Sequence, residues 1–492
     1  MRDFSGENFS RQLSFALAMA LLGSATILAV VRPLIEADAW EYHLPFSARL
    51  WDLGGGKASF HLNAKTEARW DGFPLAWEWV QGLFWAATSS LRATIVPQLV
   101  LCFAYFAYVR HVLNFPIFWN ILGFFACPML FIHFESTYFD LPAGLCLAIG
   151  FFALFAVLRD LRLGIFSRMH ASVALASLGL AGNIKFQSLL SCYLIIGIAA
   201  LFYLFNNGLN RGYRGYFLGL LAACTVLAST SVASNFVRHQ NPFYPAQIQL
   251  GNAVVFSGPE NVKAESPSPT YQIFHKVVTL PGPINFFLSI TEFDWALRGV
   301  VPSYTIDSWG GDIPQRGGPG RTGGWGSLFA TLNFFIIVLQ IFMTSKKEDE
   351  RQHQLALACL LLIVGTSFFP IAHELRYWLC IPLIMVPVNL KFLYERLNGP
   401  ITLSALGAMT AYGVMQVLSS PFSHVVLGTG NFSQEAPAPL IAALQKTGRY
   451  CAPYGDYIFR FSEAVTGRPG LLSNDPKDCE QLPQGNRMKF TQ

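Results

Sequence analysis

The chain has 492 residues, of which 53% are hydrophobic and 13% are charged, and its mean hydropathy is +0.40. Typical soluble domains carry about 25% charged residues, so this chain has too few polar side chains to cover a water-facing surface. The composition excludes a soluble protein and predicts an all-α polytopic membrane protein. The net charge of +5 is spread along the chain instead of forming a basic tract, which argues against nucleic acid as a partner.

Apolar runs long enough to cross a bilayer recur along the chain. A hydrocarbon core of about 30 Å needs roughly 20 apolar residues in a helix. We expect about eleven transmembrane helices, near residues 13–35, 93–112, 116–134, 139–158, 171–185, 187–205, 214–234, 326–344, 355–372, 377–394 and 401–419. The stretch 71–91 could be a twelfth, but Glu78 and three tryptophans favour a helix that lies at the membrane interface.

The distribution of arginine and lysine predicts the orientation of these helices. With the N-terminus inside, the inner segments carry Arg2, Arg11, Arg110, Arg159, Arg162, Arg168, Arg211, Arg214, Lys346, Lys347, Arg351, Lys391 and Arg396. The short outer loops carry Lys185 and Arg376. The positive-inside rule therefore predicts a plasma (inner) membrane protein with a cytoplasmic N-terminus and an outward C-terminus. A transmembrane domain, 1–420, would have long outer loops at 36–92 and 236–325 and be followed by an extracytoplasmic tail domain, 421–492.

The cysteines fall into two groups. Seven lie in apolar segments, where a free thiol behaves as a small hydrophobic group, and Cys451 and Cys479 lie in the polar tail. Because an outward tail meets an oxidising compartment, we expect these two to pair. No metal-ligand spacing or cofactor motif occurs in the sequence, which leaves any metal requirement open. The glycine-rich stretch 310–326 is expected to form a mobile lid.

Ionisable and aromatic residues gather where the predicted helices meet the outer face. In chain order they are Glu36, Asp38, Glu41, Tyr42, His43, Glu135, Asp140, Lys185, His373, Glu374, Arg376 and Tyr377. A charge at the bilayer centre costs about 2.5–3.5 kcal/mol on insertion scales, and such residues tend to face a cavity. Their occurrence at one predicted depth indicates a polar site that opens outward.

Each of these residues also has a simpler interpretation. Asp140 precedes an apolar helix and suits an N-cap. Arg376 suits a side chain that snorkels to water, and Lys185 could satisfy the carbonyls of a tight helical hairpin. His43 could be an ordinary interface histidine, and Asp38 a solvated loop charge. The functional interpretation therefore depends on the whole set.

Together these stretches resemble the bacterial GT-C glycosyltransferases, relatives of the protein O-mannosyltransferases and of the transferase that adds aminoarabinose to lipid A. The matching stretches are "DAWEYHLP" (38–45), "YFDLPAG" (138–144), "NIKFQSL" (183–189), "NPFYP" (241–245) and "HELRYWLCIP" (373–382). The resemblance covers roughly residues 10–395. This chain departs from the lipid A enzyme because no arginine follows Asp38 closely, so phosphate binding in that region would fall to Lys57, Lys65, Arg69 or more distant groups.

The resemblance implies a GT-C-like fold and an activity. Such an enzyme would move a sugar, with inversion, from a polyprenyl-phosphate donor to a hydroxyl of a lipid, polysaccharide or protein at the outer face of the membrane. A general base takes the hydroxyl proton. The resemblance aligns Asp38 with the signature aspartate, whereas Glu36 and Glu41 compete for the role by position.

The same resemblance suggests supporting roles. Tyr42 and His43 would shape the pocket, and Glu135 or Asp140 would orient the acceptor or the base. Lys185 and Arg376 are the expected ligands of the donor phosphate, where negative charge develops. Further candidates for the site are His373, Tyr377, Lys57 and Arg69.

A transporter or flippase for a lipid-linked or sugar substrate is the alternative function. Secondary transporters place polar groups near the bilayer midplane and usually contain internal repeats. The sequence has no evident repeat, and its polar groups lie at the predicted outer boundary. The pattern therefore favours an enzyme.

The first testable prediction concerns orientation. Single cysteines introduced near residues 60, 310 and 470 should react with an impermeant thiol reagent added outside the cell, because the predicted outer segments contain them. Cysteines near 165 and 348 should react only after the membrane is permeabilised. Labelling of 165 or 348 from outside would contradict the predicted orientation.

Overall fold

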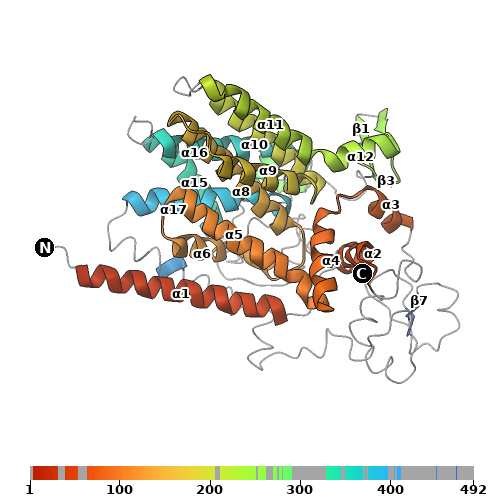
Figure 1. The fold of residues 1–492 in the computed structure, drawn as a ribbon, viewed down its shortest axis with the longest axis horizontal. Coiled ribbons are helices and arrows are strands. Elements are labelled where there is room, and N and C mark those ends of the chain that lie inside the picture. The colour runs from red at the N-terminus through yellow and green to blue at the C-terminus, as the bar shows by residue number, and fades with distance from the viewer. Residues whose placement is uncertain are drawn as a thin grey trace.

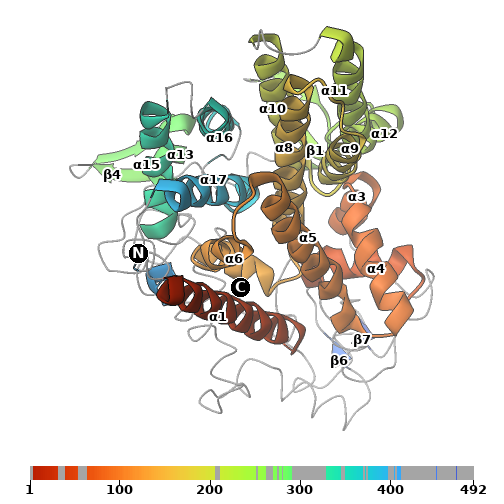
Figure 2. The same ribbon diagram turned by 60° about the vertical axis from the view of Figure 1, so that its left-hand side comes forward.

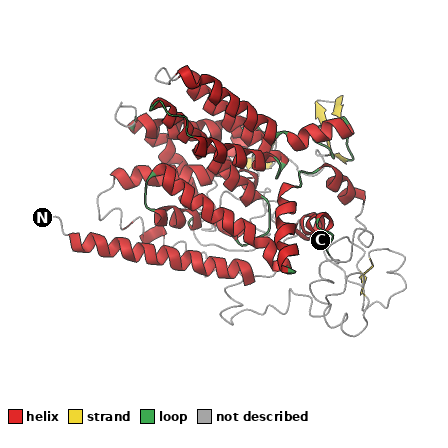
Figure 3. Cartoon of the chain, in the orientation of Figure 1, coloured by secondary structure: helices red, strands yellow, loops and turns green. Residues whose placement is uncertain are grey.

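The chain is mainly helical in the computed structural model (Figure 3). The structure describes residues 4–31, 39–53, 64–205, 211–250, 253–261, 270–273, 276–279, 281–290, 328–344, 350–369, 372, 375–396, 404, 407–409, 411, 450–451 and 472–473.

Helices of 7 to 28 residues form a bundle around α8, as Figures 1 and 2 show. They are α1 (Phe4–Val31), α5 (Val96–Leu113), α6 (Ile117–Phe125), α7 (Pro128–Phe134), α8 (Asp140–Arg162), α9 (Arg168–Gly182), α10 (Phe186–Phe205), α11 (Arg214–Ala228), α12 (Thr230–His239), α15 (Leu328–Met343), α16 (Glu350–Thr366) and α17 (Cys380–Arg396). Helix α8 contacts α5, α9, α10 and α17, and the apolar part of α8 is entirely buried. A helix that is apolar on all sides can be buried in this way only at the centre of a bundle.

Four described helices are long and apolar enough to cross a membrane: Gln12–Val31, Leu91–Leu113, Asp140–Arg162 and Phe186–Phe205. Helices α11 and α12 form a fifth candidate if the pair, which is bent by 49°, counts as one span. The protein is therefore a multi-pass membrane protein, as the composition predicts. The predicted number of about eleven is not confirmed, and the last predicted run, 401–419, lies largely outside the described residues.

Two runs that the sequence predicts as continuous spans are broken in the structure. The run 116–134 forms α6 and α7, because Cys127 is extended and Pro128, which has no N–H to donate, begins the second helix. The run 214–234 bends between α11 and α12 at Ser229. Both predictions were wrong about continuity, since apolar composition does not reveal where the helix axis changes direction.

Shorter elements cover one end of the bundle. The π-helical turn η1 (Ala39–His43), α2 (Leu44–Leu50), α3 (Ala64–Gly72), α4 (Ala76–Thr88) and the 3-10 turn η3 (Leu91–Ile95) precede α5. Strand β1 (Ala246–Leu250) pairs antiparallel with β2 (Ala253–Phe256) and parallel with β3 (Glu260–Asn261). Figure 1 shows α2, α3, α4 and this sheet beyond the C-terminal end of α1. Parts of both predicted outer loops thus lie at the same end.

The remaining described elements are short. A hairpin of β4 (Thr270–Ile273) and β5 (Lys276–Thr279) precedes α13 (Gly282–Ile290), η4 spans Arg211–Tyr213 and η7 spans Leu375–Trp378. In the predicted tail domain, β6 (Tyr450–Cys451) pairs parallel with β7 (Leu472–Ser473). Cys479 and the glycine-rich stretch 310–326 lie outside the described residues, so the expected disulfide and lid remain predictions.

The opposite end of the bundle is rich in arginine. Arg351 Nη2 donates to the Val112 carbonyl at 2.5 Å, and Arg162 Nη2 lies 3.2 Å from Glu350 Oε1. These contacts bring the last turns of α5 and α8 beside the first turn of α16. We call this the arginine-rich end; it includes Arg110, Arg159, Arg162, Arg168 and Arg351. All five belong to predicted inner segments, but the orientation of the bundle in the membrane remains a prediction.

A proline inside α17 is compensated by a neighbouring helix. Pro387 has no N–H, so the Leu383 carbonyl, four residues earlier, lacks its usual partner in the helix. Tyr105 on α5 donates its hydroxyl to the Leu383 oxygen at 2.6 Å, and Tyr105 is buried. An unpaired carbonyl inside a membrane bundle is costly, so this bond connects α5 to α17 at the point where α17 is weakest.

Replacing Tyr105 with Phe should lower the free energy of unfolding by about 1–3 kcal/mol, because the Leu383 carbonyl would stay buried without a donor. Adding Pro387→Ala should reduce this loss, since the alanine N–H can bond to Leu383. Unfolding of the four proteins of this double-mutant cycle in detergent measures the coupling. If Tyr105→Phe lowered the free energy of unfolding equally with and without Pro387→Ala, Tyr105 would not be compensating for the proline.

Candidate active site

Three segments that are distant in sequence meet at the end of the bundle opposite the arginine-rich end. Helix α8 begins at Asp140, Lys185 immediately precedes α10, and η7 contacts both helices. Lys185 Nζ donates to Asp140 Oδ1 at 2.6 Å and lies 4.2 Å from the centre of the Tyr377 ring. We call Asp140, Lys185, Arg376 and Tyr377 the Asp140 cluster.

Asp140 is held as an ion-pair partner and not as a helix cap. The N-cap of α8 is Phe139, and no side-chain bond caps this helix, so the N-cap interpretation of Asp140 is wrong. The Asp140 side chain is only 4% exposed. Its negative charge lies in the first turn of α8, where the helix dipole stabilises an anion.

His133 approaches the second oxygen of the same carboxylate. Its Nε2 atom lies 3.8 Å from Asp140 Oδ2, while its Nδ1 atom lies 2.8 Å from the Met129 carbonyl oxygen. A carbonyl oxygen can only accept, so Nδ1 carries a hydrogen. In a neutral His133 the Nε2 atom then carries no hydrogen, and this atom makes no hydrogen bond with any described residue. The approach to Asp140 is therefore an ion pair only when His133 is protonated.

Lys185 can face Asp140 because Asn183, and not Lys185, makes the hydrogen bonds that the backbone of the helical hairpin needs. Asn183 Nδ2 lies 2.7 Å from the carbonyl oxygens of both Gly179 and Leu227, and Asn183 Oδ1 accepts from the Ser231 backbone N–H at 3.0 Å. The carbonyl-satisfying role considered for Lys185 thus belongs to Asn183. The Lys185 side chain remains 25% exposed, so its ammonium is accessible.

Arg376 and Tyr377 form the part of the cluster contributed by η7. Arg376 Nη2 donates to the Tyr377 hydroxyl at 2.9 Å, and its guanidinium lies 4.8 Å from the Tyr377 ring centre. Arg376 is 6% exposed, so it does not snorkel to water, contrary to the simpler interpretation. Tyr377 therefore lies between two cations, Lys185 and Arg376.

A buried histidine–glutamate pair adjoins the cluster. His43 Nδ1 and Glu78 Oε1 are 3.0 Å apart, and both residues are buried. The His43 ring centre lies 3.5 Å from that of Phe139, the residue before Asp140, and 4.2 Å from that of Tyr42. The stretch "EYHLP" is thus in contact with the start of α8.

Burial sets the charge of this pair. Burial raises the pKa of Glu78 well above its ordinary value. Burial, followed by the positive charge of Lys185, lowers the pKa of His43 well below its ordinary value. Although the two groups are close enough for an ion pair, both shifts favour a neutral pair in which Glu78 donates to Nδ1. The His43 hydrogen is then on Nε2.

Two glutamines hold the turn between α7 and α8. Gln98 Nε2 lies within 2.7–3.2 Å of the carbonyl oxygens of His133, Phe134 and Ser136, and Gln81 Nε2 donates to the Thr137 carbonyl at 3.3 Å. The turn is buried, so these carbonyls need protein donors. Glu135, in the same turn, is buried as well.

Several predicted site residues cannot be placed. Glu36, Asp38, Lys57, His373 and Glu374 lie outside the described residues, as does the Glu41 side chain. Arg69 is described: its Nε donates to Glu260 Oε1 at 2.7 Å, and its guanidinium lies 5.1 Å from the Tyr42 ring centre. Arg69 thus links α3 to β3.

Sequence reasoning missed Glu78, His133, Gln98 and Asn183. Glu78 had a signal, because it is an acid between two tryptophans in an apolar stretch, but that pattern also suits an interfacial helix. The expected interfacial helix is α4, and its Glu78 side is buried against His43. No group of three or more metal-binding side chains occurs among the described residues.

The neutral His43–Glu78 pair predicts a pH effect on stability. Because the Glu78 pKa is raised in the folded state, its stabilising contribution is present below its unfolded pKa and is lost as pH rises. Glu78→Gln should therefore gain stability relative to the original protein between pH 5 and pH 8, by on the order of 1 kcal/mol for each pH unit through which Glu78 stays protonated. The lowered pKa of His43 changes stability with pH in the opposite direction, but His43 is present in both proteins and so does not account for the difference between them. Thermal unfolding in detergent checks this, and a pH-independent difference would contradict it.

The chain is similar in fold to ArnT from Cupriavidus metallidurans. Against the crystal structure of ArnT in the apo state, the TM-score is 0.54 at 11% identity, covering 95% of this chain and 86% of ArnT. Against ArnT bound to undecaprenyl phosphate, it is 0.51 at 12% identity, covering 94% and 86%. No protein-family model and no curated protein matches the sequence. The chain therefore has an ArnT-like fold, as the resemblance in the sequence predicts.

Proposed function

We propose that this protein is a GT-C glycosyltransferase that transfers a sugar from a polyprenyl-phosphate donor to an acceptor hydroxyl. The observation that carries the proposal is the Asp140 cluster, which gathers the cations Lys185 and Arg376 at one end of a fold that in ArnT binds undecaprenyl phosphate. A leaving phosphate needs positive charge where its negative charge develops. Reaction would take place at the outer face of the membrane, on a lipid, polysaccharide or protein acceptor.

Lys185 and Arg376 are the proposed phosphate ligands. Lys185 has three N–H donors, and one of them is directed to Asp140, which leaves donors for a phosphate oxygen. Arg376 has five donors in a planar fork that suits two phosphate oxygens. Asp140 and Tyr377 would keep Lys185 in place by the ion pair and the ring contact.

Asp38 is the proposed general base. It lies five residues before His43, whose ring packs against Phe139 beside Asp140. This short connection supports a base close to the phosphate ligands. Glu36 and Glu41 are the competing bases, and Glu135 or Asp140 would orient the acceptor. In the neutral pair, His43 Nε2 carries a hydrogen, so we assign it hydrogen-bond donation in the pocket and not proton acceptance.

Two measurements separate an enzyme from the transporter or flippase. Cells that lack this protein should accumulate a polyprenyl-phosphate sugar and lose one envelope glycan, which identifies both substrates. Purified protein should then transfer that sugar to that acceptor in detergent, where no compartments exist. Loss of the glycan without transfer in detergent would favour the transporter.

The catalytic assignment predicts distinct effects of three substitutions. Asp38→Asn should reduce turnover by roughly 10²–10⁴-fold, because asparagine cannot accept the hydroxyl proton. It should leave donor affinity unchanged, because asparagine has nearly the same size as aspartate. Lys185→Ala and Arg376→Ala should weaken donor binding as well as turnover, because they contact a phosphate that is charged before reaction. Turnover and donor binding of the purified variants check the assignment.

Lys391→Ala is a matched control, because Lys391 pairs with Glu395 in the last turns of α17, away from the Asp140 cluster. It should transfer normally. If Asp38→Asn transfers normally whereas Glu36→Gln or Glu41→Gln is inactive, the base is wrong but the enzyme class stands. If all three acid variants transfer normally, the proposed function fails.

A further inference from the structure

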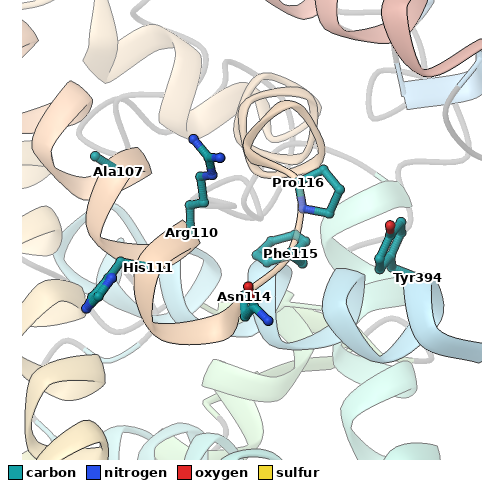
Figure 4. A pocket seen from close by; sticks show the side chains of 7 residues that line it. All are labelled: Ala107, Arg110, His111, Asn114, Phe115, Pro116 and Tyr394. Carbon is teal, nitrogen blue, oxygen red and sulfur yellow. The ribbon is translucent and has the colours of Figure 1, made fainter. Parts of the chain in front are cut away.

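A cavity of about 690 Å³ lies at the arginine-rich end (Figure 4). It is lined by Ala107, Arg110, His111, Asn114, Phe115, Pro116 and Tyr394. The lining comes from the last turns of α5, the turn that leads to α6, and the last turns of α17. Its volume lies in the range of about 300–1,000 Å³ that is usual for small-molecule sites.

Arg110 supplies an available positive charge at this cavity. It is exposed and makes no hydrogen bond or ion pair with any residue that the structure describes. Arg159 and Arg162 at the same end pair with Asp160 and Glu350. An arginine that lines a cavity without an acidic partner is suited to bind an anion, and its fork matches a phosphate group.

The surface next to Arg110 is apolar and exposed. Val100 and Phe103 are 56% and 44% exposed, and Ala107, which lines the cavity, is exposed as well. Spacings of three and four residues place all three on the same face of α5 as Arg110. Because α5 together with η3, Leu91–Leu113, is long and apolar enough to span the membrane, this face would contact lipid chains and lead to Arg110 at headgroup level.

Asn114 gives the site a second polar group. It has φ 55° and ψ 51°, and its N–H donates to the Arg110 carbonyl at 2.9 Å, so it ends α5 in a left-handed conformation. Figure 4 shows Asn114 between His111 and Tyr394 in the lining of the cavity. Asn114 and Tyr394 can therefore bond headgroup hydroxyls beyond a phosphate. A polyprenyl monophosphate has no such groups.

We propose that this cavity binds the headgroup of an anionic phospholipid, with Arg110 on the phosphate and with acyl chains along the exposed face of α5. A glycerol headgroup provides the hydroxyls that Asn114 and Tyr394 can bond. The site is independent of the proposed transfer reaction, since it lies at the other end of the bundle.

Native mass spectrometry of the full-length protein can measure the binding of phosphatidylglycerol and of phosphatidylcholine. Phosphatidylglycerol should bind more tightly, and Arg110→Gln should weaken its binding about tenfold, the loss expected for one charged hydrogen bond. Asn114→Gly keeps the left-handed turn but removes the amide, so it should weaken binding several-fold.

Arg168→Gln is the control, because Arg168 is also exposed at the arginine-rich end but does not line the cavity. It should bind phosphatidylglycerol as the original protein does, and all variants should keep the original unfolding temperature. Equal binding of the two lipids, no loss in Arg110→Gln, or an equal loss in Arg168→Gln would overturn the proposal. Displacement of phosphatidylglycerol by equimolar undecaprenyl phosphate or inorganic phosphate would overturn the phospholipid assignment.

Discussion

The ion pair between Asp140 and Lys185 is the interaction on which the candidate site depends. It joins the start of the buried central helix to the hairpin before α10, at 2.6 Å, with the aspartate side chain 4% exposed. Removing the Asp140 carboxylate from water costs several kcal/mol, and the attraction of a partner charge often does not offset that cost. Such a pair is weak evidence for stability. A function that requires a positioned cation gives a better reason for its presence.

The bundle around this pair meets its backbone requirements through side chains. Asn183 bonds to the backbone of the hairpin between α9 and α10, and Gln98 bonds to the backbone of the turn before α8. Tyr105 bonds to the Leu383 carbonyl that Pro387 leaves without a helical partner. Inside a membrane bundle no water can take over such bonds, so buried irregular backbone needs a dedicated donor. Two of these stretches flank the ion pair, because Asn183 lies two residues before Lys185 and the turn held by Gln98 leads into Asp140.

Much of the fold could be predicted from the sequence, because a membrane helix has a strong local signal. The breaks at Pro128 and Ser229 were harder to predict, since a proline or a serine in an apolar run does not always bend it. Asp140 and Lys185 were expected in one polar site because they lie at the same predicted depth, but their direct ion pair was not predicted. The Glu78–His43 contact, which joins residues 35 positions apart, could not be predicted, because no local periodicity encodes which faces of two helices meet.

The length of the central helices keeps the Asp140 cluster apart from the proposed lipid site at Arg110. At about 1.5 Å per residue, the 23 residues of α8 span about 35 Å from Asp140 to Arg162. A single lipid phosphate cannot contact both Asp140 and the arginine-rich end over that distance. A phospholipid held at Arg110 could therefore influence the Asp140 cluster only through the protein between them. Helix α17 provides a direct connection, because it begins at Cys380, two residues after η7, and carries Tyr394 at the cavity. Helix α8 provides a second one, because it begins at Asp140 and packs against α5, which carries Arg110.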